Sequence, residues 1–185
     1  MSAPSTPLPL TFCRPSLEFR AAFEAWRADW RDGDPNYDAY RWIFARAWND
    51  FDWYVTLCHH LRREGHPPEL AVPLDAHWAF CGEALVGELY LFYEPVNGDN
   101  HIGYKVRPSY RRRGIATALL QYGLERMREY GIPIARLTCR DTNLASAAVI
   151  ERAGGVRLED SRSSEGHLIR RYAVPASPAS TDDPP

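Results

Sequence analysis

The sequence lacks any closely spaced pair of cysteines. Its four cysteines, at positions 13, 58, 81 and 139, are far apart in the 185-residue chain. A zinc site or a redox-active dithiol normally uses a Cys-x-x-Cys pair, so neither is expected, and small buried side chains are the better interpretation. The adjacent His59 and His60 do not indicate a metal site either, because neighbouring residues of a helix point in different directions and cannot bind one ion together. No metal site is predicted.

The sequence also lacks the features that mark membrane, secreted and nucleic-acid-binding proteins. No apolar run approaches the roughly 20 residues that cross a bilayer, and no basic segment followed by an apolar one opens the chain, so we expect a cytoplasmic protein. The net charge of -2 and the pI near 6.3 give no general attraction for nucleic acid. Neither a G-x-x-x-x-G-K-[ST] loop nor a complete G-x-G-x-x-G motif occurs, which argues against ATP or NAD as the ligand.

The residues that are present suffice for one globular domain. Hydrophobic residues make up 45% of the chain and charged residues 25%, which is ordinary for a folded soluble protein and excludes disorder in the middle of the chain. Residues 1–10 and 175–185 are rich in proline and serine and are expected to be flexible tails. A single domain is therefore predicted for residues 11–174.

Secondary structure can be predicted along most of this domain. A first helix is expected to begin after Ser16 as its N-cap, and a second helical region covers residues 37–63 with a break near Asn49. Alternating apolar residues predict strands over 77–81 and 85–93, and Asn97-Gly98 is a hairpin signal. Further strands are expected over 101–106, 134–139, 156–158 and 167–174, with helices over 116–130 and 143–153 between them. This order predicts a mixed α/β fold.

The most informative stretch is residues 101–131, where a strand runs through a short turn into a helix. Pro108 lacks an N–H and ends the strand, and apolar residues at helical spacing continue from Ala116 to a stop at Gly131. Between them lie three arginines, Arg111 to Arg113, and then Gly114. Small residues let a ligand approach the backbone, while the free amides and the dipole at a helix start attract anions. The turn is thus predicted to bind a diphosphate.

This turn resembles the acetyl-coenzyme A loop of the GNAT superfamily of N-acetyltransferases. The family pattern is Arg or Gln, two residues, Gly, one residue, and Gly or Ala, which Arg111, Gly114 and Ala116 match. The segment LTCRDTNLASAAVIERAGGV is similar to the second half of the family's core, and similarity to a bacterial branch of predicted acetyltransferases extends over about residues 50–174. The resemblance implies a mostly antiparallel twisted sheet with a splayed parallel pair of strands, flanked by helices.

The same resemblance implies which residues hold acetyl-CoA. Pantetheine would lie in the wedge between the strands at 101–106 and 134–139, held by the backbone around Tyr104, Lys105 and Val106. The diphosphate would meet the loop and the helix start, which comprise Arg111, Arg112, Arg113, Gly114, Ile115, Ala116 and Thr117. Asn143 and Ser146 would reach the pantetheine from the next helix, and for Asn143 an N-cap role is compatible with that contact.

The catalytic residues are not where the family usually has them. Ile150 takes the place of the tyrosine that often protonates the thiolate, and Thr138 takes the place of a glutamate base. The remaining candidates for proton transfer are His101, whose ordinary pKa suits a base, Glu88 and Tyr172. A chain of water molecules is equally compatible, which would leave positioning as the enzyme's main contribution.

Three functions are left open by these residues. The leading one is transfer of an acetyl group from acetyl-CoA to an amine of a small molecule or a protein. A non-catalytic acyl-CoA-binding module is the alternative, motivated by Ile150 and Thr138. A weaker possibility is a protein that binds phosphorylated or nucleic-acid partners through Arg111 to Arg113. A homodimer is compatible with the resemblance.

Overall fold

Two antiparallel sheets lie next to each other in the computed structural model, which describes residues 8–30, 49–60, 74–96 and 99–176. The first sheet has the order β1 (Thr11–Cys13), β2 (Leu74–Cys81), β3 (Ala84–Val96) and β4 (Asn100–Val106). The second has the order β5 (Ile134–Arg140), β8 (Leu168–Pro175) and β6 (Val156–Arg157), and β7 (Ser161–Arg162) pairs with β8. The predicted mixed α/β fold is confirmed, although the short strands β1 and β7 were not foreseen.

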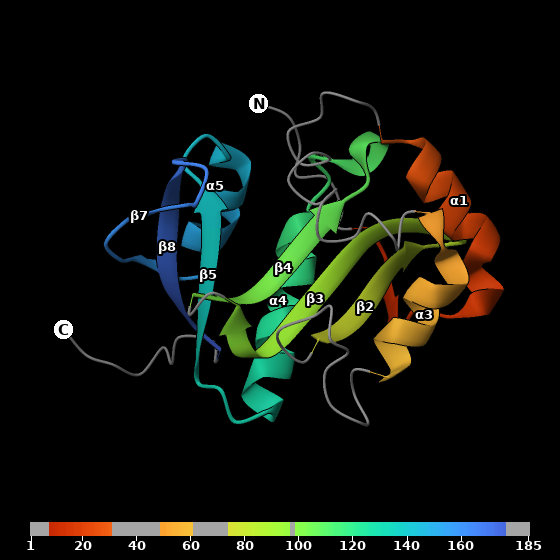
Figure 1. Cartoon of the computed structure of the whole chain (residues 1–185). Coiled ribbons are helices and arrows are strands. Elements are labelled where there is room, and N and C mark those ends of the chain that lie inside the picture. Colours follow the sequence, from red (N-terminus) through yellow and green to blue (C-terminus); the bar gives the residue numbers. More distant parts are fainter. Residues whose placement is uncertain (1–7, 31–48, 61–73, 97–98, 177–185) are drawn as a thin grey trace.

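Helices cover both faces of the first sheet (Figure 1). On one face lie α1 (Arg20–Ala28), which follows the 3-10 turn η1 (Leu17–Phe19), and α3 (Phe51–His60). On the other face lies α4 (Ile115–Glu129), preceded by the 3-10 turn η2 (Pro108–Tyr110), whereas α5 (Leu144–Arg152) covers the second sheet. None of the helices in the described residues is long and apolar enough to cross a membrane.

The helix α4 packs very closely against the first sheet, and two glycines make this possible. A Cβ added to Gly123 would lie 3.3 Å from the side chains of Ile102 and Leu89, and one added to Gly87 would lie 2.8 Å from Leu119. The predicted stripe of Leu120, Leu124 and Met127 is buried in the same core. This contact fixes where the N-terminus of α4 lies relative to the end of β4.

Other expectations from the sequence have mixed outcomes. Ser16 stands before η1, but its side chain makes no capping hydrogen bond, so the predicted side-chain cap is wrong. The strand and helix boundaries after residue 74 agree with the predicted ones within a few residues. Of the predicted helical region 37–63, α3 is observed, and residues 37–48 and 61–63 lie outside the described residues, as does the predicted hairpin turn at Asn97-Gly98.

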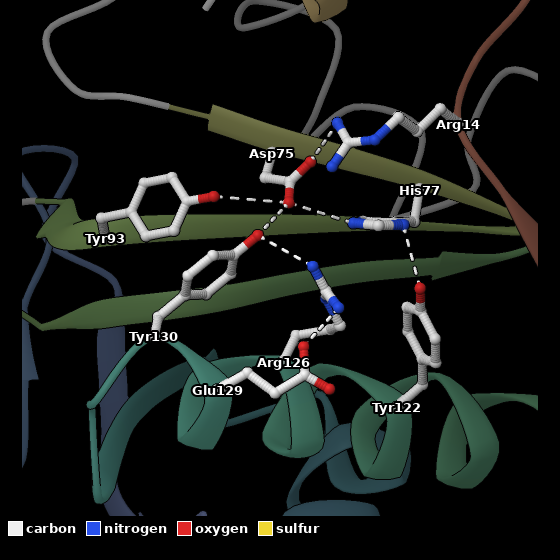
Figure 2. Close-up of polar contacts among 8 residues, drawn as sticks. All are labelled: Arg14, Asp75, His77, Tyr93, Tyr122, Arg126, Glu129 and Tyr130. Atoms are coloured by element: carbon white, nitrogen blue, oxygen red, sulfur yellow. Dashed lines mark hydrogen bonds and ion pairs between the residues drawn. The ribbon is translucent and has the colours of Figure 1, made fainter. Parts of the chain in front are cut away.

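A buried carboxylate ties the C-terminal half of α4 to the first sheet, and Figure 2 shows its partners. Asp75 on β2 has no exposed surface; its Oδ1 lies 2.6 Å from Arg14 Nη1, and its Oδ2 accepts a hydrogen bond of 2.7 Å from Tyr130 at the end of α4. His77 Nε2 lies 3.2 Å from Oδ2, and His77 Nδ1 lies 3.2 Å from the hydroxyl of Tyr122. Burial alone would raise the pKa of Asp75, but the bonds from these partners outweigh it and hold the pKa well below its usual range.

We expect Asp75→Asn to lower the free energy of unfolding at pH 7 by about 2 kcal/mol, because the partly buried Arg14 loses its counter-charge and the Tyr130 hydroxyl loses a charged acceptor. The folded-state pKa is lowered, so this contribution is complete above the unfolded pKa near 3.9 and is lost as pH falls through the folded-state value. Denaturant unfolding between pH 7 and pH 3 measures the effect of the substitution and the onset of this decline, which starts near the unfolded pKa. Glu129→Gln, which removes an exposed partner of Arg126, is the matched control and should cost less than about 0.5 kcal/mol. An equal loss of unfolding free energy in Asp75→Asn at every pH would show that the stabilisation by Asp75 is not electrostatic.

Candidate functional site

The two sheets meet at β4 and β5, which run in the same direction but diverge (Figure 1). They are not hydrogen-bonded neighbours in either sheet. Near the start of β4, side chains bind the backbone of β5: the amide of Arg136 donates to His101 Nδ1 at 2.8 Å and that of Thr138 to Asn100 Oδ1 at 3.2 Å. Side chains thus replace the missing backbone ladder at this end. The strands separate towards Val106 and Arg140, and this separation is the wedge that the family resemblance implied.

At the open end of the wedge, the loop before α4 adopts an unusual backbone conformation. Arg112 has a φ of 62° and Gly114 a φ of 80°, both in the left-handed region. This conformation costs about 1 kcal/mol for a residue with a side chain, and such residues gather at functional sites. A Cβ on Gly114 would meet nothing within 4 Å, so this corner of the loop is open.

The start of α4 supplies backbone amides to the same corner. Gly114 is the N-cap, and its carbonyl accepts the amide of Ala118 at 3.1 Å. The amides of Ile115, Ala116 and Thr117 precede that first bond, and amides of the first helical turn have no partner within their helix. Together with the helix dipole, they make this end of α4 suited to an anion.

The three arginines of the loop have different surroundings. The guanidinium of Arg111 lies 5.3 Å from the ring centroid of Trp30, which follows α1, and that of Arg113 lies 5.1 Å from the ring centroid of Tyr110. Arg112 and Arg113 are exposed, whereas Arg111 is half-buried. Arg112 and Arg113 can therefore add positive charge around the loop, while Arg111 also fastens the loop to the end of α1.

The start of α5 lies across the wedge from β4. Asn143 is the N-cap of α5, and its Oδ1 accepts the amide of Ser146 at 3.1 Å. The hydroxyls of Ser146 and Tyr104 lie 2.9 Å apart, which links α5 to β4. The structure thus brings together Tyr104, Asn143 and Ser146, three residues that the resemblance assigned to the pantetheine side. It also places Leu144 there with 64% of its surface exposed, which periodicity alone could not indicate.

The side chain of Lys105 points away from the wedge, into a polar group on the α1 face of the sheet. Its Nζ lies 3.2 Å from Glu88 Oε2 on the neighbouring strand, and 3.4 Å from the hydroxyl of Tyr90. Glu88 also accepts hydrogen bonds from Trp78 Nε1 at 3.1 Å and from the Tyr90 hydroxyl at 2.8 Å. We call the buried residues Tyr54, Trp78, Glu88, Tyr90 and Lys105 the Glu88 cluster.

Burial lowers the pKa of Lys105, and the nearby charge of Glu88 opposes that shift. The pKa of Tyr90 is raised well above its ordinary value, chiefly by burial and then by the charge of Glu88. The Glu88 cluster therefore combines a carboxylate, an ammonium group that gives up its proton more readily than usual and a phenol that keeps its proton. Because Lys105 belongs to β4, its backbone can contribute to the wedge while its side chain does not.

The other two predicted catalytic residues have structural partners. His101 is buried at the closed end of the wedge, where burial and then the charge of Arg136 lower its pKa, so that it is neutral at pH 7. Tyr172 on β8 is buried and donates a 2.9 Å hydrogen bond to Glu151 on α5. Burial and that hydrogen bond raise the pKa of Tyr172. Within the described residues, no group of three or more His, Cys, Asp or Glu residues is placed to hold a metal ion.

Known proteins resemble this chain in sequence pattern and in fold. The model of the acetyltransferase (GNAT) family matches residues 19–155. No curated protein is matched in sequence. An acetyl transferase from Salmonella typhimurium, which modifies the N-terminal serine of the ribosomal protein L7/L12, has 20% identity over 91% of this chain and 98% of that chain, with a TM-score of 0.65.

Two further solved structures have a similar fold and contain the relevant ligand. RimL, a ribosomal L7/L12 α-N-protein acetyltransferase in complex with coenzyme A, has 20% identity over 91% of this chain and 96% of that chain, with a TM-score of 0.66. The microcin C7 self-immunity acetyltransferase MccE, in complex with acetyl-CoA and AMP, has 15% identity over 90% of this chain and 92% of that chain, with a TM-score of 0.64. At these identities the similarity establishes the fold.

We expect Lys105→Met to lower the free energy of unfolding by about 3 kcal/mol, because Glu88 would remain buried without its counter-charge. The double variant Glu88→Gln/Lys105→Met should recover much of this loss, since both charges are then removed. Denaturant unfolding of the four proteins of this cycle measures the coupling. Additive effects of the two substitutions would show that the pair is not coupled.

Proposed function

Because this chain belongs to the acetyltransferase (GNAT) family, and is thus an acetyl-CoA-dependent N-acetyltransferase, we propose that its catalytic wedge lies between β4 and β5. The observation that carries this proposal is the divergence of the two strands towards the ends from which the diphosphate loop and α5 begin. A pantetheine chain is narrow and carries amides, so it can bind strand-like between two separated strands. The backbone of Tyr104, Lys105 and Val106 would bind it on one side.

The diphosphate of acetyl-CoA would be bound by the loop from Arg111 to Gly114 and by the first amides of α4. Three features support this assignment: the left-handed Arg112 and Gly114, the amides of Ile115 to Thr117, and the exposed guanidinium groups of Arg112 and Arg113. Asn143 and Ser146 would line the pantetheine side. The donor set fits a diphosphate because every one of these groups donates hydrogen bonds or carries positive charge.

The acetyl transfer requires the acceptor amine to lose a proton and the released thiolate to gain one. Of the predicted catalytic residues, His101 lies on β4 itself, and Glu88 lies opposite Lys105 of β4 and accepts a hydrogen bond from it. We therefore assign Glu88 as the final acceptor of the amine proton. Because the Lys105 side chain points away from the wedge, water would carry the proton to the α1 face of β4, where Lys105 and Tyr90 are hydrogen-bonded to Glu88. His101 and Tyr172 remain weaker candidates, since their side chains bind the backbone of β5 and Glu151 respectively.

The acceptor is an amine, and we propose a protein N-terminus or a small-molecule amine. The first is supported by the fold that this chain shares with RimL, an α-N-protein acetyltransferase. Acetyl-CoA binding by isothermal titration calorimetry and release of free coenzyme A thiol with a panel of amines test the activity. Tight binding without turnover on any amine would instead favour the alternative, a non-catalytic acyl-CoA-binding module.

The diphosphate assignment predicts that Gly114→Glu weakens acetyl-CoA binding by about a hundredfold. The new carboxylate would stand beside the diphosphate, and the two negative groups would repel each other. Gly131→Glu is the matched control, since Gly131 is also left-handed and open but lies at the opposite end of α4. Calorimetric titration of both variants with acetyl-CoA decides the matter. Equal affinities in the two variants would place the diphosphate elsewhere.

The proton-transfer assignment predicts that Glu88→Gln lowers kcat by about a hundredfold with little change in the Kd of acetyl-CoA. Glu94→Gln, an exposed carboxylate on the same strand, should leave kcat unchanged. Both variants are assayed with an amine that the wild-type enzyme acetylates, at a temperature where circular dichroism shows them folded. An unchanged kcat in Glu88→Gln would leave positioning and water as the source of catalysis.

A further inference from the structure

The end of α1 is joined to the turn that precedes the diphosphate loop, although about 80 residues separate them in sequence. Asp29 directly follows α1, and its Oδ2 accepts three hydrogen bonds: from the amide of Ser109 at 2.9 Å, from the Ser109 hydroxyl at 2.7 Å and from Arg107 Nε at 3.2 Å. Figure 1 shows η2 beside this end of α1. One side chain thus binds two residues of a single turn.

The turn held by Asp29 needs support from outside itself. It begins at Arg107, whose amide donates to Val86 on β3 at 2.9 Å, and it closes through the amides of Tyr110 and Arg111. A 3-10 turn of three residues has poor hydrogen-bond geometry and little stability of its own. The charged acceptor on Asp29 makes stronger bonds than these backbone contacts, so it fixes the direction in which the chain leaves β4.

A second residue at the end of α1 holds the loop two positions further on. Trp30 follows Asp29, is buried, and lies under the guanidinium of Arg111, with 5.3 Å between the guanidinium carbon and the ring centroid. The segment 107–111 is therefore held at both ends by two consecutive residues. The left-handed Arg112 comes immediately after it, so the brace sets the starting point of the proposed diphosphate-binding backbone.

The carboxylate of Asp29 is paired with groups of the turn itself. A carboxylate near a diphosphate site would repel the ligand, but the charge of Asp29 is paired with Arg107 at 3.2 Å. Burial would raise the pKa of Asp29, yet the bonds from Ser109 and Arg107 outweigh it and lower the pKa, so the ion pair persists at neutral pH. The same helix carries Phe23 and Trp26, which pack in the core around Trp78 of the Glu88 cluster.

We propose that Asp29 is a positioning residue that holds the diphosphate loop in its binding conformation, and that α1 thereby links the loop to the Glu88 cluster. This inference rests on the proposed function of the loop. Without Asp29, the loop of the free protein is no longer held in its binding conformation. Binding of the diphosphate must then order the loop, and the entropic cost of that ordering lowers the affinity for acetyl-CoA. The pantetheine part, which binds between β4 and β5, does not depend on this turn.

The experiment compares two ligands that differ in the nucleotide diphosphate. Kd values for acetyl-CoA and for S-acetylpantetheine are measured calorimetrically with the wild type, Asp29→Ala and Asp29→Asn. Asp29→Ala should weaken acetyl-CoA binding about tenfold and leave S-acetylpantetheine unchanged. Asp29→Asn keeps an acceptor oxygen for Ser109 but loses the ion pair, so its affinity should lie between those of the wild type and Asp29→Ala. Glu24→Gln, an exposed carboxylate on the same helix, should change neither Kd.

Each outcome is decisive. Unchanged acetyl-CoA affinity in a folded Asp29→Ala protein, or equal losses for both ligands, would overturn the positioning role while leaving the proposed function intact. A wild type that binds neither ligand would overturn both. Should Asp29→Ala fail to fold, Ser109→Ala removes the exposed hydroxyl donor alone and should weaken acetyl-CoA binding about threefold, and no weakening there would contradict the inference.

Discussion

The divergence of β4 and β5 is the constraint on which the rest of the structure depends. Two parallel strands joined by a helix would ordinarily complete a backbone ladder, but here Asn100 and His101 bind the β5 amides of Thr138 and Arg136 with their side chains. Those side chains keep the strands together at one end and satisfy amides that would otherwise be left without partners. The opposite ends of the two strands separate, and the helices α4 and α5 begin there.

The ends of α4 are fixed by different physical means. Its C-terminal half is tied to the sheet by a buried ion cluster around Asp75, whereas its middle is drawn onto β3 and β4 by the absence of a side chain at Gly123. Its N-terminus carries no comparable side-chain cap, because Gly114 occupies the N-cap. A helix that is rigidly held elsewhere can present its first amides to a ligand without being displaced, which is the arrangement an anion site requires.

Sequence patterns predicted the parts of this arrangement that follow from local rules. The end of β4 is marked by Pro108, and the two ends of α4 are marked by Gly114 and Gly131. The loop before α4 was indicated by its match to the family pattern at Arg111, Gly114 and Ala116. The contact of Asp29 with Ser109 could not be predicted, because it joins residues about 80 positions apart through the packing of α1 on the sheet. The direction of the Lys105 side chain was equally inaccessible, since it depends on which face of β4 lies against α1. The left-handed Arg112 was missed because arginine has no preference for that conformation.

Successive side chains of β4 point to opposite faces of the sheet, so this one strand contributes to the core against α4 and to the Glu88 cluster against α1. Ile102, Tyr104 and Val106 pack towards the core shared with α4 and α5, whereas Lys105 enters the Glu88 cluster on the α1 face. A buried ion pair such as Lys105 and Glu88 contributes little net stability compared with apolar residues of the same size. A gain in net stability therefore does not explain why the pair is there. A charged pair on one face and an apolar anchor on the other also fix the register of β4 against β3, because a shift by one residue would bury Lys105 in the apolar core.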